Sequence, residues 1–244
     1  MIPADVLASL TDEIDREFIV PPEHFNNTEG TRDNFRQYAM AAGDLNPLWS
    51  DDLYARKTHW GGVTAPPGWL TTVVRPAYSV RRLTPTGYDA LDAEIHWSFV
   101  SPVRLGDTFS VRTKVLDVTE KTTRSLGPSL FARGSIEYAD QSGNVFAVAK
   151  SSVFLYPPGA SAARVAEVQP VVATPREEVV PYEEAISGLI HRGALTRYWE
   201  SVEVGDVLAV QQRPTLTENE ITQWLIGSHV WLLHSRPLDR KSVV

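Results

Sequence analysis

Before residue 91, hydrophobic residues recur mostly at the spacing of an α-helix. One such stripe predicts a short amphipathic helix within residues 1–17. A second helix is expected to begin after Thr31, a residue type that caps helix N-termini, and to end at Gly43, which suits a left-handed C′ position. Pro66 and Pro67 then favour the start of a third helix, because proline is tolerated in the first turn. This third helix is apolar along its length, as expected for a helix wrapped by a sheet.

From residue 91 the hydrophobic period changes to two. Apolar and polar residues alternate over 93–99, which predicts a half-buried strand, and again over 109–115 and 130–138. A turn at Asp140–Asn144 leads into a fourth strand that continues through Leu155. Four antiparallel strands after one buried helix indicate an α+β fold.

The remaining residues differ in composition from this core. The stretch after Pro157 is rich in Ala, Val, Pro and Glu and reads as a linker, with a short helix possible near 182–191. Beyond it, residues 217–224 echo residues 31–38 at an offset of 186 positions (217 minus 31). Two helix starts can share such a pattern by chance, so the echo alone is weak evidence of a repeat.

Composition narrows the functional classes. The 244 residues carry 23 Lys and Arg against 30 Asp and Glu, a net charge of −7 with no basic run, which argues against a nucleic-acid partner. With no cysteine, disulfides, thiolate metal sites and a cysteine nucleophile are excluded. His191, His229 and His234 show no metal-ligand spacing with carboxylates, so no metal is expected. No cofactor is expected either. With no signal peptide and no apolar span of membrane length, the expected location is the cytoplasm, away from the membrane.

Two motifs carry the functional signal. Gly43-Asp44-Leu45-Asn46-Pro47-Leu48-Trp49 is followed by Trp60-Gly61-Gly62-Val63-Thr64-Ala65-Pro66-Pro67. Together they resemble the signature of MaoC-like hydratases and dehydratases, which add or remove water at an acyl thioester. The resemblance covers roughly residues 15–156 and implies a hot-dog fold, a curled antiparallel sheet around a central helix.

The chemistry of that family needs a base for water, an acid for the α-carbon and donors for the thioester oxygen. The resemblance places the catalytic aspartate at Asp44, and the family histidine five residues later is replaced by Trp49. An indole has a donor and no acceptor, so it cannot take a proton from water. Pro66 falls where single-domain hydratases place a glycine that donates its N–H, and proline has none. Stand-alone activity is therefore doubtful.

The resemblance also implies which residues contact the substrate, and His59 lies in the loop that leads to the helix. The expected substrate-binding residues are Asn46, Trp49, His59, Gly62, Ala65, Pro66 and Trp69, with Asp44 as the candidate catalytic residue.

The closest resemblance is to the N-terminal, FAS1-like dehydratase unit of proteins with two hot-dog units. Tyr198–Asp206 resembles the opening of their second unit. The expected domains are therefore a hot-dog domain at 1–158, a linker at 159–196 and a truncated second hot-dog unit at 197–244. No Gly-Asp-x-Asn-Pro-x-His occurs in this last segment.

Four functions remain open. The chain could be a hydratase or dehydratase subunit whose partner supplies the catalytic Asp and His, or a non-catalytic acyl-thioester binder or structural protein. A hot-dog thioesterase ranks last, because residues 66–74 carry no carboxylate. Activity within this chain would use Asp44 with a substitute such as His59. The expected partners are an acyl-coenzyme A or acyl carrier protein thioester, and a second hot-dog subunit in a homodimer or heterodimer.

Overall fold

The computed structural model describes residues 2–157, 175–177, 180–181, 184, 198–206 and 218–228. The chain forms two compact units, one made of Met1–Gly30 with Pro67–Val168 and the other of Thr31–Pro66 with Gln169–Val244. Most of the expected linker, and most of the possible helix near 182–191, lie outside the described residues.

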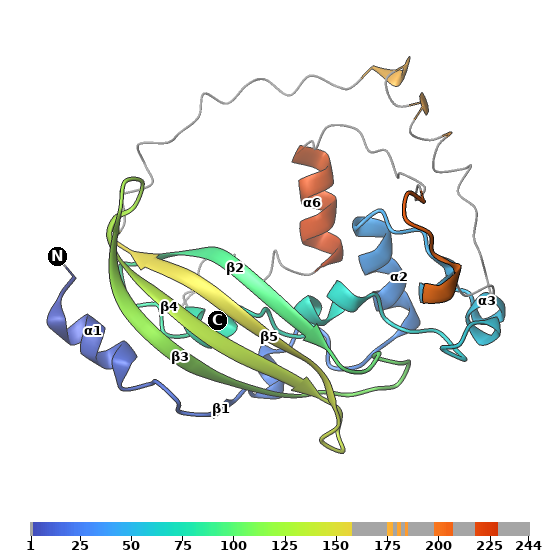
Figure 1. Ribbon diagram of the computed structural model, residues 1–244. Helices are drawn as coiled ribbons and strands as arrows, with labels where there is room; N and C mark the ends of the chain where they lie inside the picture. The colour runs from blue at the N-terminus through green and yellow to red at the C-terminus, as the bar shows by residue number, and fades with distance from the viewer. Residues whose placement is uncertain are drawn as a thin grey trace, which may run out of the picture. The chain divides into compact units, whose positions relative to one another are not determined.

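The first unit is built on an antiparallel sheet (Figure 1). Its strands are β1 Phe18–Ile19, β2 Asp89–Phe99, β3 Ser110–Thr123, β4 Gly127–Ala139 and β5 Val145–Tyr156, in the order β1-β3-β4-β5-β2. The four long strands confirm those expected from the two-residue period. The short β1, which pairs with β3 through Phe18 and Thr113, was not anticipated.

Helical segments complete both units. The first unit contains α1 Ala4–Thr11, the 3-10 helices η1 Pro22–His24 and η3 Pro67–Thr72, and α4 Tyr78–Arg81. The second contains α2 Arg32–Ala41, η2 Pro47–Trp49, α3 Asp52–Lys57, η5 Trp199–Ser201 and α6 Glu218–Gly227. Among the described residues, no helix is both long and apolar enough to cross a membrane.

Two expected helices differ from the sequence interpretation. The first ends at Thr11, well before residue 17, and Ile14 instead forms a bridge with Val115 of β3. The helix expected from Pro66 is the 3-10 helix η3 followed, after a break, by α4. Pro76 explains the break, because proline removes a backbone donor and disfavours the α conformation of the residue before it.

The short helix α4 packs directly on the inner face of the sheet. Gly134 of β4 makes this approach possible, since a Cβ there would lie 2.2 Å from Ser79 Oγ. Ser79 Oγ and Ser151 Oγ are 3.3 Å apart, and Ser151 also donates to the Pro76 carbonyl at 3.1 Å. The hydrophobic core lies between α4 and the inner face of the sheet. On the sheet side it includes these fully buried side chains: Val111, Val115, Leu130, Ala132, Ile136, Ala149, Val153 and Leu155.

Strand β2 forms an open edge of the sheet and is less buried than its alternating pattern predicts. Ile95 and Phe99 point to the apolar side yet remain 40% and 50% exposed, and Leu91 on the other side is 48% exposed. The expectation of a half-buried strand was wrong in this respect, because among the described residues β2 has a neighbouring strand on one side only, β5. A β-bulge between Asp92 and Glu94 also changes which side chains face inward.

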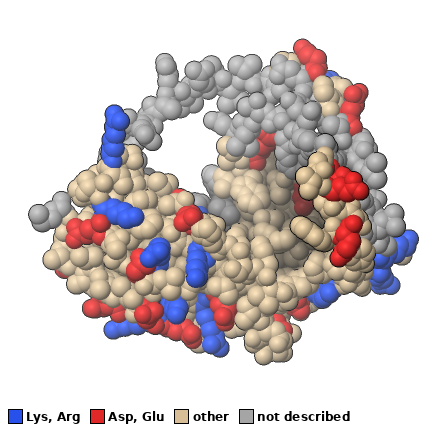
Figure 2. Space-filling model, in the orientation of Figure 1, with Lys and Arg blue, Asp and Glu red and all other residues tan. Residues whose placement is uncertain are grey.

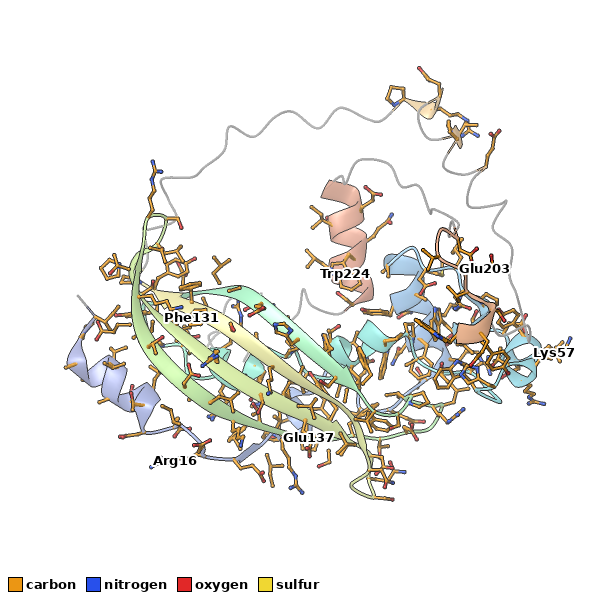
Figure 3. All side chains as sticks on the ribbon, viewed as in Figure 1. Arg16, Lys57, Phe131, Glu137, Glu203 and Trp224 are labelled. Atoms are coloured by element: carbon orange, nitrogen blue, oxygen red, sulfur yellow. The ribbon has the colours of Figure 1, made fainter. Side chains whose placement is uncertain are left out.

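The outer face of the sheet is polar and mixed in charge. Figure 2 shows Lys and Arg interspersed with Asp and Glu over this part of the molecule. Arg133 of β4 pairs there with Asp117 of β3, and Glu137, labelled in Figure 3, lies beside Arg112 in the strand register. Over the described residues, the charges on the outer face of the sheet are therefore mixed in sign.

Candidate functional site

The site begins at the C-terminus of α2. Thr31 caps the helix by accepting from the Asn34 N–H at 3.3 Å, as predicted. At the other end Gly43 adopts φ +62°. Its N–H donates to the Met40 carbonyl at 2.9 Å, and the Asp44 N–H donates to Ala39 at 2.8 Å. This pair of bonds is a Schellman motif, which requires the left-handed glycine and turns the chain sharply at Asp44.

Three of the predicted site residues meet in the turn that follows. Asp44 Oδ1 accepts from the Asn46 N–H at 3.0 Å, and Asn46 Oδ1 accepts from the Leu48 N–H at 3.0 Å. The indole Nε1–H of Trp49 donates to Asp44 Oδ2 at 2.9 Å. The side chain five residues after the aspartate thus reaches the carboxylate, and Trp49 as a residue is only 9% exposed.

This arrangement limits what Asp44 can do chemically. Each of its oxygens accepts one hydrogen bond, so the side chain of Asp44 stabilises the turn. Trp49 offers only a donor, so the pair can hold a negative charge but cannot pass a proton between its two members. General-base catalysis by a neighbouring ring nitrogen, as a histidine would supply it, is absent from this pair.

The loop beyond Trp49 is held by one helix cap and by the side chain of Arg32. Asp51 caps α3 by accepting from the Leu53 and Tyr54 N–H groups at 2.8 and 3.1 Å. Arg32 joins this loop to the start of α2, because it pairs with Asp52 at 2.7 Å and donates to the Ser50 carbonyl at 2.8 Å. These bonds fix the direction in which the chain leaves the Asp44 turn.

The other predicted residues of this unit lie along the segment after α3. His59 is exposed and its ring packs on Trp60 with centroids 4.3 Å apart. Gly62 is half-buried, whereas Ala65 and Pro66 are buried. Their roles in substrate binding stay predictions.

Trp69 belongs to the other compact unit. It is fully buried on η3, and its ring packs against Phe109 with centroids 5.6 Å apart. A side chain in this position contributes to the core of the first unit. Its predicted contact with substrate stays a prediction.

The structure reveals a charged network that the sequence interpretation missed. Arg75 and Arg81, on either side of the start of α4, both bind Asp92 of β2, at 2.5 and 2.7 Å. Arg81 also donates to the Ala90 carbonyl at 3.0 Å. Burial lowers the pKa of Arg75, Asp92 opposes that shift, and the charge of Arg81 adds to it. The network ties the edge strand to the central helical segment, and nothing in the spacing of these three residues signals it.

Tyr138 makes a second unexpected link to the central segment. Its hydroxyl donates to the Val74 carbonyl at 2.5 Å, and the side chain is fully buried. Burial raises the pKa of Tyr138 well above its usual value, so the phenol stays neutral and keeps its proton as a donor.

Two described cavities lie on the outer face of the sheet. They enclose about 420 and 380 Å³ and share Leu116 and Lys150. The rest of their lining is mainly polar or charged, unlike the apolar walls that an acyl chain needs. Within the described residues, no group of three or more His, Asp or Glu is placed to hold a metal ion.

Sequence comparison relates the chain to known proteins. Residues 24–149, just over half of the 244, match the family described as FAS1-like, dehydratase domain region. A UPF0336 protein of Streptomyces griseus is 32% identical over 88 residues, which cover 34% of this chain. The chain spans 59% of the length of that relative.

Structural comparison supports the same fold. A solved MaoC-like dehydratase matches 90% of this chain and 67% of its own length, with a TM-score of 0.61 and 19% identity. One chain of the ChsH1-ChsH2 complex from Mycobacterium tuberculosis matches over 64% of this chain and 97% of its own length, with a TM-score of 0.50 and 19% identity. At these identities the likeness establishes the fold alone, and it confirms the expected α+β hot-dog architecture.

Proposed function

Because this chain belongs to the FAS1-like dehydratase domain family, among the MaoC-like hot-dog dehydratases, we propose that it is the acyl-thioester-binding subunit of a hydratase or dehydratase. The reaction is the addition of water to an enoyl thioester, or its removal from a 3-hydroxyacyl thioester. The acyl group arrives on coenzyme A or acyl carrier protein, and a partner chain supplies the catalytic Asp and His.

The hydrogen bond from Trp49 to Asp44 carries this proposal. In a hydratase the residue at this position must accept a proton from water, and the indole nitrogen has no free lone pair. The same bond uses Oδ2 of Asp44, and the backbone of Asn46 uses Oδ1. The Asp44 turn is therefore present, but Trp49 stands where the family has its proton-transferring histidine. This combination favours a role in binding the acyl thioester over a role in catalysis.

The open edge of the sheet favours association with a second hot-dog subunit. β2 pairs with β5 on one side, and its other side, which pairs with none of the described strands, can accept another strand. Its exposed apolar residues Leu91, Ile95 and Phe99 are suited to burial in such an interface. The similar ChsH1-ChsH2 structure is itself a complex, and we propose a homodimer or heterodimer for this chain.

Hydration of crotonyl-coenzyme A tests the proposal. The loss of enoyl absorbance is followed with the purified chain alone and then with the hot-dog protein encoded beside it, where that protein carries the Gly-Asp-x-Asn-Pro-x-His motif. We expect no turnover by the chain alone and turnover by the mixture. Asp44→Asn in this chain should leave the activity of the mixture within about twofold, because Asp44 takes no part in proton transfer.

Turnover by the pure chain that Asp44→Asn abolishes would overturn the proposal in favour of activity within this chain. The exposure of His59, whose described ring contact is with Trp60, speaks against that route.

A non-catalytic acyl-thioester binder is the second candidate. The Trp49–Asp44 bond supports this candidate as well as it supports the subunit, since neither function requires a general base at this site. Binding of acyl-coenzyme A by the chain, together with an inactive mixture, would select this candidate. A thioesterase remains the least supported, because η3 and the residues around it carry no carboxylate to activate water.

A further inference from the structure

The larger cavity on the outer face of the sheet has the size of a small-molecule site. It encloses about 420 Å³, and strands β3, β4 and β5 supply all of its described lining except Glu17. Lys150 of β5 lines it and alternates with the fully buried Ala149, so the cavity and the hydrophobic core lie on opposite faces of the sheet. We call it the Lys150 cavity.

A β-bulge in β3 shapes the wall of this cavity. The register between β3 and β4 shifts from Val115 to Asp117, so Leu116 is an additional residue of β3. Bulges re-aim side chains and are frequent beside functional sites. Leu116 lines the cavity together with Val148 of β5, and the two side chains give an otherwise polar cavity an apolar part.

Three lining residues stand in one row across adjacent strands. The register pairs Lys114 of β3 with Ser135 of β4, and Ser135 with Lys150 of β5. Adjacent strands are about 4.8 Å apart, so the two lysines flank Ser135 with about 10 Å between their strands. A lysine side chain is long and flexible, and both ammonium groups can therefore approach one oxyanion above the Ser135 hydroxyl.

Some polar side chains of the cavity are not used within the described part of the chain. The side chains of Ser135, Glu137 and Lys150 form no hydrogen bond or ion pair with any described residue. Lys114 has only a distant partner, Asp15 at 4.0 Å, whose side chain is 75% exposed. Such an exposed pair contributes little, so Lys114 is also available to a ligand.

The smaller neighbouring cavity differs in this respect. Its charged side chains include two closely paired sets, His96 with Glu94 at 2.6 Å and Arg133 with Asp117. These groups already satisfy one another, which makes the smaller cavity a poorer site for a charged ligand.

The charge of the Lys150 cavity favours an anion. Three cationic side chains line it, Arg112, Lys114 and Lys150, against the two carboxylates of Glu17 and Glu137. Glu17 lies 3.6 Å from Arg112, so it offsets that cation and leaves the two lysines opposite a single carboxylate.

We propose that the Lys150 cavity binds a phosphorylated sugar. The phosphate lies above Ser135, between the ammonium groups of Lys114 and Lys150, and accepts from the Ser135 hydroxyl. Glu137, labelled in Figure 3, follows two positions later on β4 and on the same face, about 7 Å along the strand. Its carboxylate accepts from the sugar hydroxyls, as acidic side chains do when they bind ribose.

This site does not depend on the proposed acyl-thioester function, because it lies on the opposite face of the sheet from α4. A free sugar phosphate and a nucleotide share the chemistry that the cavity recognises. The two sources are therefore separated by experiment.

Isothermal titration calorimetry of the full chain with ribose 5-phosphate, AMP and inorganic phosphate tests the site. We expect at least one phosphorylated sugar to bind about tenfold or more tighter than inorganic phosphate, because only the sugars reach Glu137. Tighter binding of AMP identifies a nucleotide, and tighter binding of ribose 5-phosphate a free sugar phosphate. Equal affinities assign recognition to the shared sugar phosphate. No measurable binding of either sugar, or equal binding of inorganic phosphate, overturns the proposal.

Three variants show where the ligand binds. Lys150→Gln should weaken binding of the phosphorylated sugar by about tenfold or more, because it removes a cation from the phosphate. Glu137→Gln should weaken binding of the sugar without weakening binding of inorganic phosphate. Lys57→Gln is the matched control, since Lys57 is exposed on α3 in the other compact unit and its loss changes the net charge equally. If Lys57→Gln weakens binding as much as Lys150→Gln, the anion is held by net charge alone and the proposed site is excluded.

Discussion

The indole N–H of Trp49 donates to Oδ2 of Asp44 across 2.9 Å, so the side chain five residues after the aspartate reaches it by hydrogen bond. The Schellman turn at Gly43 and the Asn46 cap bring the two side chains together. In the MaoC-like family this motif ends in a histidine that transfers protons. Here the residue at that position is Trp49, whose indole N–H donates a hydrogen bond and cannot accept a proton.

Trp49→Phe should destabilise the protein by about 2 kcal/mol, because it leaves Oδ2 of Asp44 without its described donor. Urea denaturation measures the change. Trp199→Phe is the control, since Trp199 is 86% exposed and the substitution should cost less than about 0.5 kcal/mol. Equal effects of the two substitutions would contradict a structural role for the Trp49–Asp44 bond.

Asp92→Ala should cost about 3 kcal/mol, because it leaves Arg75 and Arg81 partly buried beside each other without their shared carboxylate. Asp117→Ala is a matched control, since its partner Arg133 is 58% exposed and such surface pairs contribute less than about 1 kcal/mol. Similar losses in the two variants would show that the network does not anchor β2.

Gly134→Ala should destabilise the fold by about 1–3 kcal/mol, because the methyl group would overlap Ser79 where α4 rests on the sheet. Ser79→Gly in the same chain removes the overlapping side chain and should recover part of the loss. Thermal unfolding of the two single variants and the double variant measures the coupling, and strictly additive changes would refute the contact.

Tyr138 makes stability depend on alkaline pH. Its pKa is raised in the folded protein, so its contribution is fully present below the unfolded value near 10 and is lost as pH rises above it. Urea denaturation between pH 9 and 12 should show a falling free energy of unfolding, and Tyr138→Phe should flatten that fall by up to about 1.4 kcal/mol per pH unit. Tyr198→Phe, at a side chain 65% exposed, should leave the slope unchanged.

Phe99→Lys on β2 should weaken self-association or association with a hot-dog partner by at least about tenfold, because it places a charge in the proposed apolar interface. Light scattering over a range of concentrations measures the effect. Leu53→Lys is the control, since Leu53 is 72% exposed on α3, away from β2 in the chain. An unchanged dimer in the Phe99 variant would exclude the β2 edge as the interface.

Local patterns were enough to predict much of this fold. The two-residue period located the four long strands, and the Thr31 cap and Gly43 marked the ends of α2, since these signals depend on neighbouring residues only. The extent of the helix after Pro66 was missed, because the break before Pro76 was not weighed against the continuous apolar face.

The candidate site was predictable only as a motif. The sequence by itself showed that Asp44, Asn46 and Trp49 occur at the spacing of the family motif. It also showed that Trp49 cannot accept a proton from water, as the family histidine would. Tertiary structure decided that Trp49 bonds to Asp44, that Arg75 and Arg81 share Asp92, and that Tyr38 packs on Trp224. The Trp49–Asp44 bond spans five residues and depends on the conformation of one turn. The Asp92 network and the Tyr38–Trp224 contact instead depend on how segments distant in the sequence pack, which no local pattern encodes.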